Sequence, residues 1–590
     1  MENQLTPEQQ TVVDSHAKNI LCCAGAGSGK TRVLINRILR LIRDGIKPSD
    51  ICCITFTNEA ARVIHDRLHP VTGEFAISLG HVGTLHSFAL KHLQTYGGMA
   101  NVTVLDDEEA DEELLRCAKN AGCKVSEKAL QAARANWLTE QHLPKDPCRI
   151  AVASYYRAME ATRALDFNSI LTKAHEHLVD PNITGPLKRA WKHLFIDEAH
   201  DSSRVDMAIY AAIQTENRFV VCDPDQSIFS FRGGDVTCIL ELAEQKQLSS
   251  SAPEWELLRL EGNFRSSQAI CDVAQKLIEH NTNRIPKRMV SLAGREAAPD
   301  SAHQTALKPR INLENKEVSV ASRAFETGVS EAVTIAGTLS QLFERNEAEP
   351  NDVAILARTN AIAENIAETL EAHRIPVRRR VKPNLPEDWK KAKAAVRMLQ
   401  ARNDDAIIRF MRLESPSAIA HAERQHALGK MNLREEFMTG LECTLDGLGR
   451  DLKRLRISFA STERACLTAD AIPDATLADV VLALSQDFEH ETIGSGVFCS
   501  TVHQSKGKEF QIVIIVGCEE NGFPLRNASI EEERRVMFVA MTRAKKTLRL
   551  TWAKARKESW GRREYAEREE SRFIREALQH ENEVESAKGR

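Results

Sequence analysis

A glycine-rich loop near the start of the chain has the composition of a phosphate-binding loop. It lies between the apolar run NILCC and the amphipathic run TRVLINRILRLI, and it reads Ala24-Gly25-Ala26-Gly27-Ser28-Gly29-Lys30-Thr31. Small residues between a strand and a helix let backbone N–H groups converge on phosphate oxygens, which the helix N-terminus also attracts. We expect Lys30 to reach the β- and γ-phosphates of a nucleoside triphosphate and the Thr31 hydroxyl to bind Mg²⁺.

A second apolar run, HLFIDE, ends in two acidic residues and completes such a site. Asp197 is expected to hold Mg²⁺, directly or through water, and Glu198 to polarise the attacking water. Together with the loop, this pair predicts hydrolysis of a nucleoside triphosphate. It does not say what the hydrolysis drives, because kinases, transporters and other machines share the same loop.

Composition excludes several classes of protein. The chain has 590 residues, 42% of them hydrophobic, and a net charge of -4, which argues against a passive, purely electrostatic DNA binder. No uninterrupted apolar stretch approaches the roughly 18 residues of a membrane span, so we expect a cytoplasmic protein without membrane contact. The 14 cysteines show no C-x-x-C spacing and are expected to be buried, reduced thiols rather than metal ligands.

Short apolar runs alternate with amphipathic helical patterns in two regions, which predicts parallel α/β sheets. The runs are NILCC, ICCITF, HLFIDE and RFVVCD in the first region, and VAILAR, IVIIVG and TLRLTW in the second. Each region is interrupted by a mainly helical stretch, so we predict an α/β fold of two cores, each with a helical insertion. The predicted divisions are 1–88 and 191–262 for the first core, 89–190 for its insertion, 263–382 and 494–576 for the second core, 383–493 for its shortened insertion, and 577–590 for a charged tail.

Further motifs occur in an order that resembles the UvrD/Rep-like superfamily 1A DNA helicases, from residue 5 to about residue 576. In the first half they are LTPEQQ from Leu5 (Q motif), ITFTN from Ile54 (Ia), GTLHSF from Gly83 (Ib), and DPDQSIF with FRG from Asp223 (III). In the second half they are GNFRS from Gly262 (IV), DVAILARTN from Asp352 (IVa), TVHQSKGKEF from Thr501 (V), and EERR through TRA from Glu532 (VI). The resemblance implies two RecA-like cores with ATP and Mg²⁺ bound between them.

The resemblance also implies roles around the nucleotide. Gln9 would read the adenine edge, Phe264 and Arg32 would stack on the base, and Glu509 would bind the ribose. Gln226 would sense the γ-phosphate, and Arg265 and Arg543 would reach it across the cleft between the cores. A planar guanidinium suits the charge that develops on a transferring phosphoryl group.

For the nucleic acid, the resemblance implies a single-stranded DNA track that ends at a junction with duplex. Phe56, His86 and Phe231 match positions on which bases stack, a sequence-tolerant contact. Asn58, Arg358 and His503 match further strand contacts, and Phe167 matches another motif of the family. The sequence leaves RNA open as the strand, because stacking and phosphate contacts do not read the 2′-hydroxyl.

The chain departs from the family at several positions. His200 stands where motif II usually has glutamine, Glu59 replaces a common lysine, and Lys508 replaces a leucine in motif V. The largest change is in the second insertion, which is short and has Pro416-Ser417-Ala418-Ile419-Ala420 in place of a Gly-Ile-Gly element that contacts duplex. Without those glycines the backbone has less freedom to approach phosphate.

These features predict an ATP-dependent 3′→5′ DNA helicase or translocase acting in repair, replication or recombination. The main alternative is a DNA-activated ATPase subunit of a repair, phage, plasmid or defence complex that does not unwind processively, and the altered duplex element favours it mildly. A helicase–nuclease ranks lower, because no further domain follows motif VI. A nucleotide-binding regulator without turnover ranks lower still, because Lys30, Glu198, Arg265 and Arg543 are intact.

Overall fold

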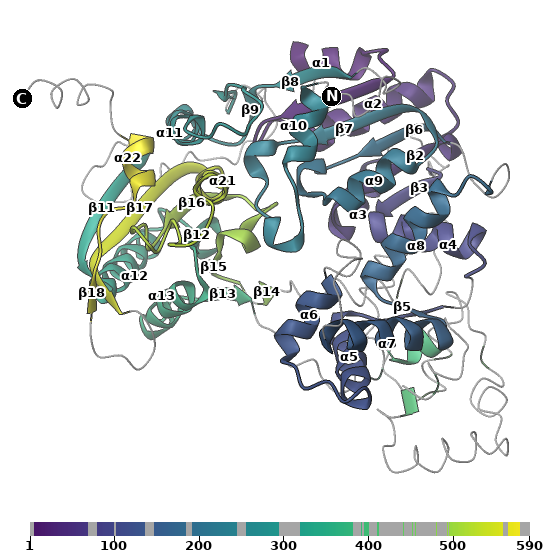
Figure 1. The fold of residues 1–590 in the computed structure, drawn as a ribbon. Helices are drawn as coiled ribbons and strands as arrows, with labels where there is room; N and C mark the ends of the chain where they lie inside the picture. Colours follow the sequence, from purple (N-terminus) through teal and green to yellow (C-terminus); the bar gives the residue numbers. More distant parts are fainter. Residues whose placement is uncertain are drawn as a thin grey trace, which may run out of the picture.

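A computed structural model of the protein describes residues 5–68, 79–99, 102–135, 147–183, 191–244, 255–293, 319–380, 495–557 and 565–578, and scattered residues between 391 and 493. Two twisted, largely parallel β-sheets flanked by helices dominate it, one drawn in purple to blue and the other in teal and yellow (Figure 1). This architecture confirms the predicted α/β class with two cores.

The first sheet has six parallel strands in the order β3-β2-β6-β7-β1-β8. Their bounds are β1 Asn19–Ala24, β2 Ile51–Thr55, β3 His81–Thr84, β6 Trp191–Ile196, β7 Thr215–Cys222 and β8 Glu256–Leu260. All residues of β1 and β2 are buried, as expected of parallel strands covered on both faces. The four apolar runs that predicted strands here are β1, β2, β6 and β7. Sequence patterns missed β3 and β8, whose runs HVGT and ELLRL carry a weaker signal.

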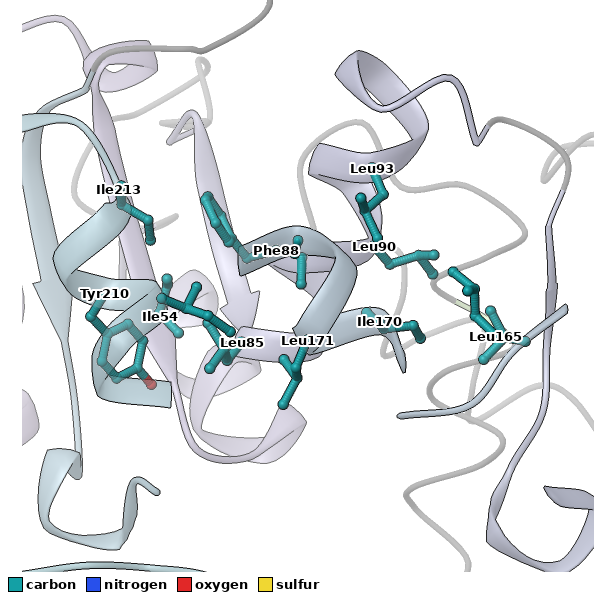
Figure 2. Packing of buried hydrophobic residues seen from close by; sticks show 14 of the residues in the cluster. Ile54, Leu85, Phe88, Leu90, Leu93, Leu165, Ile170, Leu171, Tyr210 and Ile213 are labelled. Carbon is teal, nitrogen blue, oxygen red and sulfur yellow. The ribbon is translucent and has the colours of Figure 1, made fainter. Parts of the chain in front are cut away.

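Helices cover both faces of this sheet. They are α1 Pro7–Asp14, α2 Lys30–Arg43, α3 Asn58–Leu68, α4 Leu85–Tyr96, α8 Phe167–Val179, α9 Arg204–Ala212 and α10 Thr237–Ala243. Alternate residues of β1 point to opposite sides: Ile20 and Cys22 pack with α1, α2 and α3, whereas Leu21 and Cys23 pack with α4, α8 and α9. Figure 2 shows part of the cluster that contains Leu21 and Cys23, in which side chains of α4 and α8 meet.

Part of the stretch predicted as the first insertion forms a separate unit. It contains a two-stranded parallel sheet and three helices with a core of their own: β4 Thr103–Val104, β5 Ala164–Leu165, α5 Asp107–Asn120, α6 Glu127–Ala135 and α7 Pro147–Ala161. The boundary predicted after residue 88 falls inside α4, and α8 packs with α4 and α9 on the first core. Helical periodicity alone does not separate these two helices from the insertion, because both have ordinary amphipathic patterns.

The second sheet has the order β11-β17-β16-β12-β15-β13-β14, with β18 antiparallel to β17. The strands are β11 Val320–Thr327, β12 Val353–Ala357, β13 Val377–Arg380, β14 Thr492–Ile493, β15 Val497–Thr501, β16 Phe510–Ile515, β17 Ala544–Lys557 and β18 Tyr565–Glu567. The helices are α11 Gln268–Glu279, α12 Gly328–Glu344, α13 Asn360–Ala372, α21 Ile530–Met541 and α22 Arg572–Leu578. The three runs predicted as strands here are β12, β16 and β17.

A short two-stranded sheet lies at the crossing between the cores. It pairs β9, Gly262–Asn263, with β10, Val290–Ser291, and the chain between them forms α11 and a connector of residues 280–289. Of the predicted second insertion, the structure describes β14 and scattered residues, and several of these, among them residues 394–396, 398 and 399, join the same apolar cluster as α4 and α8. Residues 416–420 and most of the predicted tail lie outside the described residues.

Candidate active site and strand-binding surface

The phosphate loop joins β1 to α2, and its shape depends on glycine. Gly27 and Gly29 have φ of +67° and +82°, in the left-handed region that glycine adopts at little cost. A Cβ on Gly27 would lie 2.9 Å from the Cβ of Arg265, which comes from the segment after β9. Because α2 begins at Lys30, its N-terminus faces the loop and favours a bound anion.

Lys30 and Glu198 form an ion pair inside the first core, with Nζ 2.8 Å from Oε2. Burial alone lowers the pKa of Lys30, but the charges of Glu198 and Asp223 outweigh it and the pKa is raised. Burial likewise raises the pKa of Glu198, and the charges of Lys30 and Lys506 reverse the effect and lower it. The structure thus brings the predicted lysine and the predicted water-polarising carboxylate together, and both are charged.

The two acidic residues that follow β6 differ in environment. Glu198 has φ +51°, a left-handed conformation that costs a non-glycine residue about 1–2 kcal/mol and that often marks functional sites. Burial, followed by the charge of Glu198, raises the pKa of Asp197 to about 7. A nearby divalent cation would favour the charged form of Asp197. The Thr31 hydroxyl and the Asp197 carboxylate are the oxygen donors that suit Mg²⁺, whose other ligands are commonly water and phosphate.

Arg543 crosses from the second core to the first. Its Nη2 donates to Oε1 of Gln226 at 2.9 Å, and the Gln226 side-chain amide donates to Asp223. Arg543 is 2% exposed, and burial together with the charge of Arg265 lowers its pKa to about 9. A buried guanidinium near a second one is a favourable place for an anion. The structure therefore brings together the predicted γ-phosphate sensor and one of the predicted cross-cleft arginines.

Arg265 has carboxylate and carbonyl partners on the second core. Its Nε donates to Oε2 of Glu509 at 2.8 Å and its Nη1 to the Thr542 carbonyl at 3.2 Å. Lys545 binds the other oxygen of Glu509 at 2.5 Å. Glu509, predicted to bind the ribose, holds Arg265 in place, a contact that sequence reasoning missed.

His200 connects three motifs. It is fully buried, and its Nδ1 accepts a hydrogen bond from the Asp223 N–H at 3.1 Å. Its Nε2 lies 3.2 Å from Nζ of Lys506, which also bonds to Asp201 and donates to the Gln226 carbonyl at 3.0 Å. Burial and nearby lysine charges lower the pKa of His200 well below its ordinary value, so the ring is neutral. Histidine at this position therefore maintains a hydrogen bond between motif II and motif III.

Two residues predicted to contact adenine, Phe264 and Gln9, bond to the backbone of the phosphate loop. The Phe264 N–H donates to the Gly27 carbonyl at 2.9 Å, which holds this residue beside the loop. Gln9 is buried: its Nε2 donates to the Ser28 carbonyl at 2.9 Å and its Oε1 accepts from the Thr6 N–H at 3.2 Å. The side chain that was predicted to read the base therefore also braces the loop.

An aromatic cluster spans the two cores on a half-exposed surface. Phe56 and Phe231 are 37% and 66% exposed, unusually high for phenylalanine. Phe229 lies between them, stacked on Phe56 with ring centroids 5.6 Å apart and 5.9 Å from Phe231. His503 of the second core packs edge-on against Phe231 at 5.4 Å. Phe229 was not predicted from the sequence as part of this surface, although the residue lies within motif III. A motif does not show that one ring packs between two others.

His503 completes this cluster as an uncharged ring. Burial, followed by the charges of Arg358, Lys506 and Arg232, lowers the pKa of His503 to about 4. It is therefore neutral near pH 7 and offers a ring face and a hydrogen bond rather than a charge.

Two other predicted strand contacts have protein partners. Arg358 donates from Nε and Nη2 to both carboxylate oxygens of the buried Glu533, at 2.6 to 3.0 Å. This pairing holds the guanidinium against Glu533, and Arg358 as a strand contact stays a prediction. His86 packs edge-on against Phe167, with centroids 5.3 Å apart, and Phe167 rests on the core cluster. Asn58 begins α3 and is largely buried.

Comparison with known proteins covers nearly the whole chain. Residues 5–247 match the family model of the UvrD/REP helicase N-terminal domain, and residues 258–407 and 452–555 match that of the UvrD-like helicase C-terminal domain. The ATP-dependent DNA helicase PcrA of Leuconostoc citreum is 27% identical over 98% of this chain and 85% of its own length. The proteins of the same name from Bacillus subtilis and Staphylococcus aureus are each 25% identical, over 97% and 94% of this chain and 85% and 84% of their own lengths. Among the described residues, no helix is long and apolar enough to cross a membrane.

Proposed function

Because the chain belongs to the UvrD/Rep helicase family and is an ATP-dependent DNA helicase, we propose that it moves 3′→5′ along single-stranded DNA. Movement would be powered by hydrolysis of ATP with Mg²⁺ held by Thr31 and Asp197. Bound there, Mg²⁺ would neutralise phosphate charge. Glu198 would orient the attacking water, and Lys30 would leave its carboxylate partner for the phosphates.

The observation that carries the proposal is the set of contacts that cross between the cores. Arg543 bonds to Gln226, and Lys506 bonds to Asp201 and to the Gln226 carbonyl, so the same loop of the first core receives two cations from the second. Lys506 also lies 4.9 Å from the ring centroid of Phe229 in the aromatic cluster. A change at the γ-phosphate would therefore shift both the cleft and the surface that holds the bases, which is how hydrolysis would produce a step.

The strand would lie on the aromatic cluster. We propose that this strand is DNA and that the protein moves along it to a junction with duplex. Base stacking accepts any sequence, as a translocating protein requires. A second candidate function is a DNA-activated ATPase that does not separate strands processively. The residues 416–420, which lack the glycines of the family's duplex-contacting element, favour it.

ATPase measurements with and without single-stranded DNA test the site. Lys30→Ala and Glu198→Gln should each abolish DNA-stimulated turnover while leaving DNA binding largely intact. Lys192→Ala is the matched control, because this lysine forms an exposed pair with Asp50 at 3.3 Å. Full turnover in either site variant would show that ATP is hydrolysed elsewhere.

Unwinding of tailed duplexes tests direction and outcome. Duplexes with a 3′ tail should be separated in the presence of ATP and Mg²⁺, and those with a 5′ tail should not. Separation from 5′ tails alone would overturn the proposed polarity, and ATPase activity without separation from either would select the second candidate. An RNA tail in place of DNA should support less turnover.

A further inference from the structure

Four buried charges lie behind motif III, and two of them belong to no recognised motif. Lys287 Nζ lies 2.8 Å from Oδ1 of Asp223 and 2.5 Å from Oδ2 of Asp225. Arg284 donates to both oxygens of Asp225, at 3.1 and 2.9 Å. All four side chains are at most 7% exposed. Two carboxylates and two cations balance in charge, as burial of ionised groups requires.

The two cations come from the connector of residues 280–289, between α11 and β10. The connector is fixed to α21 of the second core, because Asn281 donates to the Glu531 carbonyl at 2.9 Å and accepts from Arg534 at 2.6 Å. The Lys287 carbonyl accepts from Gln275 of α11 at 2.9 Å. Lys287 is thus held by the helices of one core while its ammonium group lies among the aspartates of the other.

The quartet is connected to the arginine that crosses the cleft. Lys287 binds one oxygen of Asp223, and the other oxygen accepts from the Gln226 side-chain amide. Because an ionised carboxylate only accepts hydrogen bonds, it draws the amide N–H₂ toward itself and leaves Oε1 facing Arg543. The orientation of the Gln226 amide therefore depends on where the Asp223 carboxylate is held.

We propose that Lys287 is a positioning residue for ATP hydrolysis, acting through Asp223 and Gln226 on Arg543. This inference rests on the proposed function, in which Gln226 and Arg543 serve the γ-phosphate. Without the ammonium group, Asp225 keeps its bonds to Arg284, whereas Asp223 loses its bonded cation and the two carboxylates repel each other. The Asp223 carboxylate then turns toward other donors, and the Gln226 amide loses the contact that sets its direction.

Lys287→Met tests this, because methionine has a similar length and no charge. The turnover number with saturating single-stranded DNA should fall about tenfold or more, as when a preorganised polar contact of a transition state is lost. The KM for ATP should stay within about twofold, because the phosphate loop and the adenine site are unchanged. A turnover number equal to that of the unmodified protein would overturn the proposal. This includes the case in which the variant differs only by a KM for ATP that is about tenfold higher.

A double-mutant cycle with Gln226→Ala separates positioning from a merely structural effect. If Lys287 acts through Gln226, the double variant should turn over no more slowly than the slower single variant. Multiplied losses would mean independent action and would overturn the proposal. The variant that combines Asp225→Asn with Lys287→Met has a balanced charge again, so it should fold even if Lys287→Met alone does not. This variant should have a melting temperature close to that of the unmodified protein and should keep the low turnover number. Normal turnover in that folded variant would also overturn the proposal.

Arg556→Met is the matched control for loss of a buried cation. Arg556 lies between two buried carboxylates, Glu331 and Glu519, in the second core and has no bond to motif III. The Arg556→Met substitution should lower the melting temperature without lowering the turnover number of the folded protein. Loss of turnover in Lys30→Ala alongside normal turnover in Lys287→Met would refute only the role of Lys287. Normal turnover in Lys30→Ala would refute the proposed function itself.

Discussion

Truncation of Phe231 should weaken single-strand binding while leaving the fold intact. Its ring is 66% exposed, so only about a third of its surface contributes to folding. Full burial of a phenylalanine side chain is worth roughly 1.5–3 kcal/mol, so Phe231→Ala should cost the fold at most about 1 kcal/mol. A base stacked on the ring is worth roughly 1–3 kcal/mol, which corresponds to a loss of about 5- to 150-fold in affinity.

Fluorescence anisotropy with a labelled oligothymidylate measures this loss at a fixed salt concentration. The slope of log affinity against log salt should not change, because the lost contact releases no counterions. Val329→Ala is the matched control, since Val329 is 54% exposed on α12 and should alter neither affinity nor melting temperature.

Two results would refute the role of Phe231. An unchanged dissociation constant would mean that the ring is simply an exposed apolar side chain, which single surface residues often are. A lower salt slope would mean that the substitution had disturbed phosphate contacts instead. Phe229→Ala should differ from Phe231→Ala in lowering the melting temperature, because Phe229 packs against rings on both sides.

Three further predictions concern the contacts between the cores. Arg543→Lys should lower the turnover number about 10²-fold or more, because an ammonium group cannot reproduce the guanidinium fork; steady-state ATPase assays measure this, and normal turnover would remove Arg543 from the site. Lys506→Met should reduce the ratio of ATPase rates with and without single-stranded DNA, and an unchanged ratio would mean that this lysine does not couple the two sites. Because the folded pKa of His503 is about 4, the unfolded chain takes up a proton near pH 6.5 that the folded chain does not. The free energy of unfolding should therefore fall as pH falls from about 6.5 to about 4, by at most about 1.4 kcal/mol per pH unit from this group, and denaturant titrations of His503→Gln should show a shallower fall than the unmodified protein.

Local patterns identified seven of the fourteen strands described in the two large sheets, and the chemistry of the phosphate loop. Runs such as NILCC and VAILAR form strands that are buried on both faces. Burial on both faces requires apolar residues at successive positions, which appear in the sequence as an unbroken apolar stretch. Gly27 and Gly29 have positive φ values that favour glycine, so these two residues indicate the loop directly in the sequence. The edge of the first insertion was harder to predict, because α4 and α8 have the same helical periodicity as the insertion that they flank.

Partners far apart in the sequence were decided by tertiary structure. Arg358 is predicted as a strand contact from its motif, and only the fold shows that it pairs with Glu533 of α21. Phe229 gains its role only from the rings packed on either side of it. Lys287 lies in an unremarkable connector and becomes a buried counter-charge only because that connector crosses to motif III.

The sequence by itself determined that this protein binds and hydrolyses a nucleoside triphosphate, because the loop and the acidic strand end are local and their residue types follow from local backbone and phosphate chemistry. Tertiary structure decided which charges face one another across the cores. An ion pair depends on distance and burial rather than on sequence spacing, so the links from Lys287 to Asp223 and from Arg543 to Gln226 exist only in the folded chain.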